Sequence, residues 1–218
     1  MITKEVKLIE YSKDVDMGNC ITHAAGAVLS VAAIVAMMIS AQGARQIVSA
    51  LIFGITMLTV YTVSAVYHGL GNGEAKRIAR LLDHSAIPLL IAGTTTPCAL
   101  VALYDISTVH GIAVLSAAWF CALFGLVSKL FFFEKLKKIT YAVYIICCSA
   151  MLFSAIPVID KMEKGSFELI ALGCVLYLVG AVFCYLGVKR EKFHVVFHVF
   201  VLLASAVHFY VIYTIIIR

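Results

Sequence analysis

Charged residues are scarce in this 218-residue sequence, at 13% of the chain against 63% hydrophobic residues. Soluble globular domains carry roughly 25% charged residues, so this composition excludes that class. Apolar runs of about 20 residues, the length of one helical membrane crossing, fill most of the chain. They leave no room for a separate soluble domain, and we expect one polytopic membrane domain.

Other features are missing as well. The apolar runs lack the alternation of apolar and polar residues that a transmembrane β-strand requires. The seven cysteines lie mostly inside these runs without C-x-x-C spacing, which excludes a disulfide framework. The formal net charge of +5 comes from basic residues in short loops, a pattern typical of membrane topology. We therefore expect no nucleic-acid partner.

Seven apolar runs are present, each the length of one crossing. They cover residues 19–42, 47–70, 81–104, 110–126, 140–159, 167–187 and 193–217. We predict an all-α domain of seven transmembrane helices over residues 1–218, in which residues 1–18 form a short polar N-terminal segment.

The basic residues predict the orientation of these helices. Counting alternate sides of the seven crossings, one side holds four basic residues: Arg45, Lys161, Lys164 and Arg218. The other side holds the remaining 13 of the 17 Lys and Arg residues. Because cytoplasmic loops carry the excess of Lys and Arg, we predict a cytoplasmic N-terminus and an extracytoplasmic C-terminus.

The last run contains three histidines but no Asp, Glu, Lys or Arg. His194 and His198 are four residues apart, so they lie about 40° apart on one helix face and can share a metal ion. His208 lies roughly 15 Å further along the axis and cannot reach that ion in a straight helix. Ionisable residues inside a membrane helix indicate a functional site by default.

The predicted orientation places further ligand-type residues at the same depth. His68 ends the second run and Asp83 begins the third, both at the cytoplasmic side with His194 and His198. The first run adds three polar residues at this level: Asp16, Asn19 and His23. We therefore predict a single polar site near the cytoplasmic face.

Simpler interpretations exist for each histidine alone. His68 could be a buried residue that hydrogen-bonds a neighbouring helix, with Ser64 bonding its own backbone. His194 and His198 could be an interfacial pair near the lipid headgroups. Their shared depth favours one site, because separately buried polar groups would each need a partner.

Three histidine ligands with an open fourth position are typical of catalytic zinc, which lowers the pKa of its bound water to about 7. Asp83 could orient or deprotonate that water, or bind the metal directly. Ser64, one turn before His68, could hydrogen-bond a developing oxyanion. The spacing does not choose between these roles for Asp83.

The motifs resemble those of the hemolysin III proteins, the bacterial branch of the progestin and adipoQ receptor family that includes adiponectin receptors. They span nearly the whole chain: Asp16-x-x-Asn19-x-x-Thr22-His23, Ser64-x-x-x-His68, Leu82-Asp83-His84-Ser85-Ala86-Ile87, and His194-x-x-x-His198 followed by His208-Phe209-Tyr210. Val15 departs from the pattern, since many family members carry a second acidic residue there.

The resemblance implies seven helices with the N-terminus inside. It also implies zinc bound by His68, His194 and His198, with Asp83 and Ser64 near its water. Related alkaline ceramidases hydrolyse a lipid amide with a similar constellation. We therefore expect a zinc-dependent plasma-membrane hydrolase that acts on an amide or ester bond of a membrane lipid.

Two alternatives stay open. One is a non-enzymatic channel or cytolysin whose path is lined by polar residues, including His23 and His208. The other is a membrane-sensing protein in which zinc only braces the helix ends. No G-x-x-x-G pair lies within an apolar run to mark a dimer interface, so the oligomeric state is also open.

Overall fold

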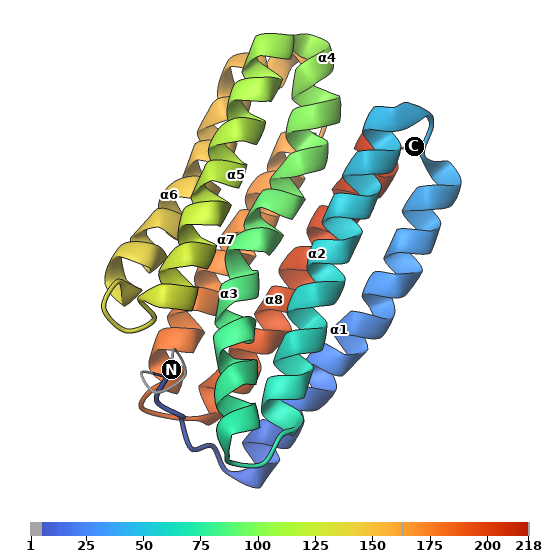
Figure 1. The fold of residues 1–218 in the computed structure, drawn as a ribbon. Helices are drawn as coiled ribbons and strands as arrows, with labels where there is room; N and C mark the ends of the chain where they lie inside the picture. The colour runs from blue at the N-terminus through green and yellow to red at the C-terminus, as the bar shows by residue number, and fades with distance from the viewer. Residues whose placement is uncertain (1–5, 163, 218) are drawn as a thin grey trace.

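The computed structural model describes residues 6–162 and 164–217, and its regular structure is entirely helical (Figure 1). The long helices are α1 (Lys13–Ser40), α2 (Gly43–Gly69), α3 (Glu74–Pro97), α5 (Thr108–Phe131), α6 (Lys137–Ala155), α7 (Ser166–Gly187) and α8 (Lys192–Val211). The shorter segments are a π-helix (Cys98–Leu103), α4 (Tyr104–Ile106), a 3₁₀-helix (Ile156–Lys161) and a second π-helix (Ile212–Ile217). The all-α prediction with seven long helices is confirmed for the described part of the chain.

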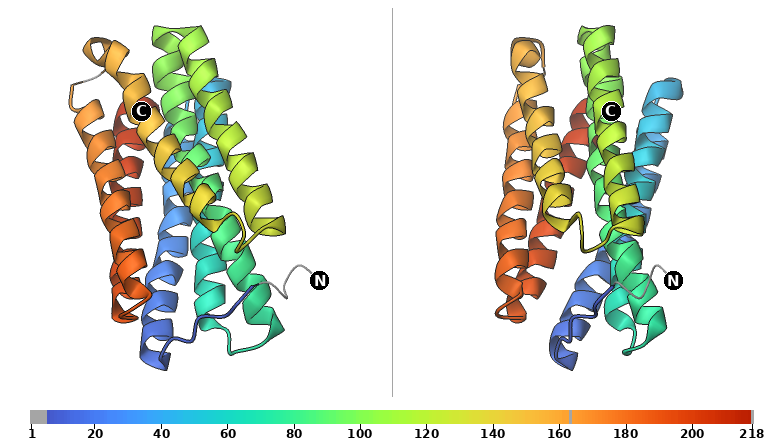
Figure 2. Two further views of the ribbon diagram at one scale, coloured as in Figure 1. Left: turned by 90° about the vertical axis from the view of Figure 1, so that its left-hand side faces the viewer. Right: turned by 60° about the vertical axis from the view of Figure 1, so that its left-hand side comes forward.

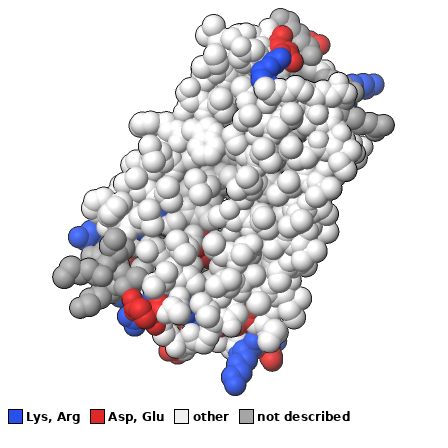
Figure 3. All heavy atoms as spheres, turned by 45° about the vertical axis from the view of Figure 1, so that its right-hand side comes forward, with Lys and Arg blue, Asp and Glu red and all other residues white. Residues whose placement is uncertain are grey.

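Six of the described helical rods are long and apolar enough to cross a membrane, and α6 contributes a shorter apolar helix. Large apolar side chains point outward, such as Ile39 (81% exposed) and Phe120 (74% exposed). Figure 3 shows charged side chains gathered near the two ends of one face, with an almost uncharged surface between them. This distribution suits a lipid-facing belt.

The bundle is closed by contact between its first and last helices. Helix α1 packs against both α2 and α8, α2 packs against α3, and α7 packs against α8. Phe53 and Met37 are fully buried in the core that these helices share. Helices α1, α3 and α8 begin at the same end of the bundle, and α2 and α7 finish there (Figures 1 and 2). We call this the site end.

The cytoplasmic orientation of the site end remains a prediction, as does the extracytoplasmic C-terminus. Two residues of the charge count, Lys4 and Arg218, lie outside the described residues.

The first helix begins earlier than its apolar run, at Lys13 instead of residue 19. Three basic residues that were expected in loops, Lys76, Arg80 and Lys129, are instead helical and only 1–3% exposed. Their side chains find partners inside the protein: Lys76 binds a carboxylate, and Arg80 and Lys129 lie over the ring of Phe133. Apolar runs therefore predict helices that are too short where basic residues at the helix ends have partners inside the protein.

Helices α2 and α3 approach closely at Gly93. A Cβ atom at this position would lie 2.8 Å from Thr56 Cβ and close to its hydroxyl oxygen. Thr56 is a β-branched residue on a helix and has little freedom to turn away. The absence of a side chain at Gly93 therefore sets the spacing of the two helices that carry His68 and Asp83.

We predict that Gly93→Ala destabilises the folded protein by about 1–3 kcal/mol, because an added methyl group overpacks this contact. Thermal unfolding in detergent would show a lower Tm than the wild type. Gly71→Ala is the matched control, since a Cβ there meets nothing within 4 Å. Equal melting temperatures for the two variants would contradict the packing argument.

Candidate metal centre

His68 is oriented by a carboxylate from another helix. It lies in the last turn of α2, is 3% exposed, and its Nδ1 is 2.8 Å from Oδ1 of Asp16 on α1. Nδ1–H donating to the carboxylate leaves the lone pair on Nε2. That Nε2 atom is buried and has no hydrogen-bond partner among the described residues. A buried imidazole with one oriented and one free nitrogen suits a metal ligand.

The same carboxylate reaches a third helix. Its second oxygen, Oδ2, accepts a hydrogen bond from Lys76 Nζ at 2.6 Å, and Lys76 belongs to the first turn of α3. Asp16 thus connects α1, α2 and α3 at the site end. Its partners are a buried imidazole and a buried ammonium group.

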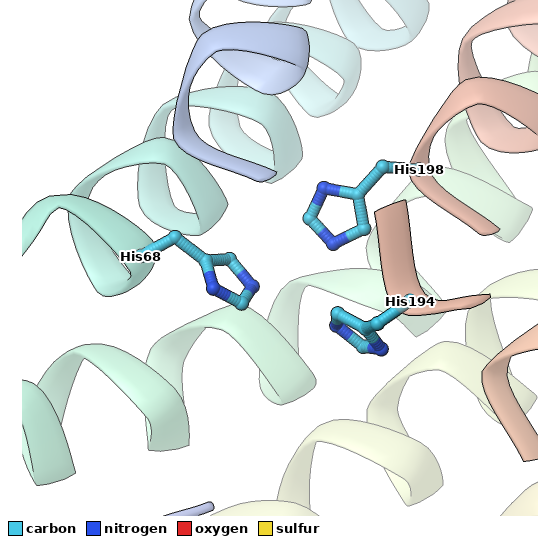
Figure 4. A group of neighbouring side chains, drawn as sticks. All are labelled: His68, His194 and His198. Atoms are coloured by element: carbon cyan, nitrogen blue, oxygen red, sulfur yellow. The ribbon is translucent and has the colours of Figure 1, made fainter. Parts of the chain in front are cut away.

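His194 and His198 lie one turn apart near the start of α8, as their spacing predicts. Together with His68 they form a group whose ligand atoms lie within 4.8 Å of one another and could hold a metal ion. Figure 4 shows the three rings around a common space between α2 and α8. Ligands at about 2.0–2.1 Å from a tetrahedral zinc ion stand roughly 3.4 Å apart. Small side-chain rotations would therefore close this group on an ion.

Asp83 and Ser64 do not join that group. The buried Ser64 side chain on α2 faces the Asp83 carboxylate on α3 and is its nearest hydroxyl partner. In this conformation Asp83 is outside the set of ligand atoms within 4.8 Å. Ser64 can orient the carboxylate here, and its expected role as an oxyanion donor remains a prediction.

Two residues of helix α1, His23 and Asn19, contact the histidines directly. The sequence predicted only that they lie at the same membrane depth. The His23 ring is 3% exposed and stacks on His198, with centroids 3.7 Å apart. The Asn19 amide nitrogen lies 3.4 Å from Nδ1 of His68. Asp16, Asn19 and His23 are spaced i, i+3 and i+7, which places all three on one helix face. That spacing was the signal that could have identified them.

The segment before α1 covers the histidines. The Tyr11 ring stacks against His194 with centroids 5.0 Å apart, and burial raises the pKa of its hydroxyl, which stays protonated. The backbone N–H of Ser12 donates to Glu191 at 2.7 Å and lowers the pKa of that carboxyl. Val6 packs against Phe133 and Leu81. Residues 6–12 therefore form a cover over the site end.

His208 belongs to a different cluster, as the helix geometry predicted. Its Nε2 lies 3.2 Å from the backbone carbonyl of Ile170, and its ring is 5.6 Å from that of Tyr177. Ser205 lies between the hydroxyls of Tyr61 and Tyr177, at 2.6 and 2.7 Å. These side chains form a buried polar cluster in the bundle core.

The fold and the three histidines define a multi-pass membrane protein with a candidate metal centre. The family model described as "Haemolysin-III related" matches residues 11–209. The chain belongs to this family.

Two similar proteins come from Bacillus species. "Hemolysin-3" of Bacillus cereus is 32% identical over 213 residues, which cover 96% of this chain and 95% of that protein. "Hemolysin-3 homolog" of Bacillus subtilis (strain 168) is 36% identical over 198 residues, or 89% of this chain and 91% of that protein. No solved structure matches significantly. The family and the apolar helices identify a multi-pass protein of the cell membrane.

We predict that Asp16→Asn weakens metal binding by about 10- to 100-fold, because His68 loses the carboxylate that orients its ring. Competition between the purified protein and a chelator would measure this change. Asp14→Asn is the matched control, since Asp14 is an exposed residue in the same helical turn. Unchanged affinity in Asp16→Asn would show that the Asp16 contact does not support a metal site.

Proposed function

We propose that this protein is a zinc-dependent integral-membrane hydrolase that acts on an amide or ester bond of a membrane lipid. The observation that carries the proposal is the group of three histidines with ligand atoms within 4.8 Å, of which His68 is oriented by Asp16. Structural zinc sites usually have four protein ligands, whereas catalytic sites have three and an open position. The described residues supply three.

The donor set fits zinc. Neutral imidazoles are ligands that zinc readily accepts, and the carboxylate behind His68 is the usual outer partner of a zinc-bound histidine. A bound zinc ion would polarise the carbonyl group of the substrate and lower the pKa of a bound water molecule to about 7. The role of the protein is to place a base and a lipid bond beside that ion.

Asp83 is the base that we propose. Its carboxylate, on α3, faces the Ser64 hydroxyl on α2, which can orient it. A carboxylate in this position can accept a proton from the attacking water and return it to the leaving group. The cover formed by residues 6–12 limits access from bulk water, which strengthens electrostatic interactions inside the site.

A cytolytic function is the second candidate. The similar Bacillus proteins carry the name Hemolysin-3, and a row of buried and partly buried polar side chains continues from the histidines into the bundle core. The row contains His23, Tyr61, Ser205, Tyr177 and His208. Polar residues inside a membrane bundle often mark a path for ions or protons. Liposome conductance that persists after His194→Ala would favour this candidate over the hydrolase.

We predict that the purified wild type contains about one zinc ion per chain and that His194→Ala loses most of it, because two ligands hold zinc poorly. Elemental analysis after gel filtration measures the content. His110→Ala, which removes a histidine far from the group, should retain the wild-type amount. A metal-free wild type, or full occupancy in His194→Ala, would remove the basis of the proposal.

We predict that Asp83→Asn keeps its zinc but lowers lipid turnover by about 10²- to 10⁴-fold, since the general base is lost. The assay is hydrolysis of a panel of membrane-lipid amides and esters, with products identified by mass spectrometry. Asp160→Asn, at an exposed carboxylate, controls for the loss of one charge. Equal turnover in Asp83→Asn and wild type would exclude Asp83 from the mechanism.

A further inference from the structure

Arg80 is a buried arginine, and two of its three side-chain nitrogens have no hydrogen-bond acceptor among the described residues. The side chain is 3% exposed, and the two nitrogens without a partner in the described part of the chain are Nε and Nη1. Within residues 6–162 and 164–217, no carboxylate forms an ion pair with it. Its guanidinium lies 5.4 Å from the centre of the Phe133 ring. Burying an arginine without an acceptor is costly, so the fold retains it against a large penalty.

A second unpaired donor lies in the same region. Tyr67 is 2% exposed, its hydroxyl has no partner among residues 6–162 and 164–217, and its ring is 4.5 Å from that of His68. Arg80 lies one helical turn after Lys76, which binds Asp16, and three residues before Asp83 on α3. The two unsatisfied groups therefore both border the candidate metal centre.

Other polar groups nearby are already engaged. Lys76 is bound to Asp16, and the Asp83 carboxylate faces the Ser64 hydroxyl. Lys129, 1% exposed, places a second buried positive charge 5.3 Å from the centre of the Phe133 ring. The unpaired N–H groups of Arg80 and the Tyr67 hydroxyl are therefore available to donate hydrogen bonds to acceptor atoms of a ligand.

We propose that Arg80 and Tyr67 bind an oxyanion, a phosphate or a carboxylate, carried by a lipid that reaches the candidate metal centre. The planar guanidinium presents paired N–H groups that match two oxygens of either anion. A lipid is the source that the location favours, because Arg80 lies in the second turn of a helix long enough to cross a membrane. Its guanidinium lies over the ring of Phe133, which packs against Val6 of the cover. This inference rests on the proposed function, in which the anion is part of the substrate or is the carboxylate product.

The test measures lipid binding without turnover. Wild type in neutral detergent is titrated with phosphatidic acid, with oleate and with uncharged diacylglycerol, and binding is followed by the shift in melting temperature and by native mass spectrometry. We expect saturable binding of at least one anionic lipid and none of diacylglycerol. Arg80→Gln should bind that lipid at least about 10-fold more weakly, since charge-assisted hydrogen bonds are lost.

Arg77→Gln is the matched control, because it removes the same charge from the same helix at a less buried position and should bind as the wild type does. Without lipid, Arg80→Gln should melt no lower than the wild type, because it removes an unpaired buried charge. A lower melting temperature together with unchanged lipid affinity would show that Arg80 is structural and overturn the inference. If Arg80→Gln does not fold, Tyr67→Phe and Arg80→Lys carry the test, and both should bind more weakly.

Two further results would also overturn the inference: binding of diacylglycerol equal to that of the anionic lipids, and saturation by inorganic phosphate alone, which would identify a soluble anion as the ligand. Repeating the titration with Asp83→Asn separates this inference from the proposed function. Selective anion binding without turnover by any variant, wild type included, would support the Arg80 site and contradict only the hydrolase.

Discussion

One carboxylate connects three helices of this bundle. Asp16 on α1 accepts from His68 on α2 and from Lys76 on α3, at 2.8 and 2.6 Å. Each partner is nearly inaccessible to solvent, so loss of the carboxylate would leave a buried ammonium and a misoriented imidazole without compensation. The position of the whole candidate centre depends on this contact, because it orients His68 toward the two histidines of α8.

Buried polar groups in the bundle core differ from those at the site end in whether they have hydrogen-bond partners. The hydroxyls of Tyr61, Ser205 and Tyr177 satisfy one another in the bundle core. At the site end, the described residues offer no partner to Nε2 of His68, to two nitrogens of Arg80 or to the Tyr67 hydroxyl. A membrane protein cannot rely on bulk water for such groups. At the site end these groups are the ones available to the metal and the anionic ligand that we propose.

Much of the architecture was predictable, because the bilayer restricts the choices available to the chain. Apolar runs of crossing length give the number and approximate positions of the helices. The four-residue spacing of His194 and His198 gives their common face, and the charge asymmetry suggested that His68 lies at their depth. The burial of Lys76, Arg80 and Lys129 was not predictable, since a basic residue at a helix end is usually solvated. Only contacts with Asp16 and Phe133 revealed otherwise.

The sequence by itself determined the helical class, the order of the helices and the ligand pair on α8, since these follow from local composition and from the period of the helix. Tertiary structure decided the rest. Packing of α1 against α8 brings His23 onto His198, and the approach of α2 to α3 brings Ser64 to face Asp83. It also leaves Arg80 without an ion pair to any carboxylate in the described part of the chain. These pairings join residues far apart in the chain, and helical periodicity contains no information about which faces of different helices meet.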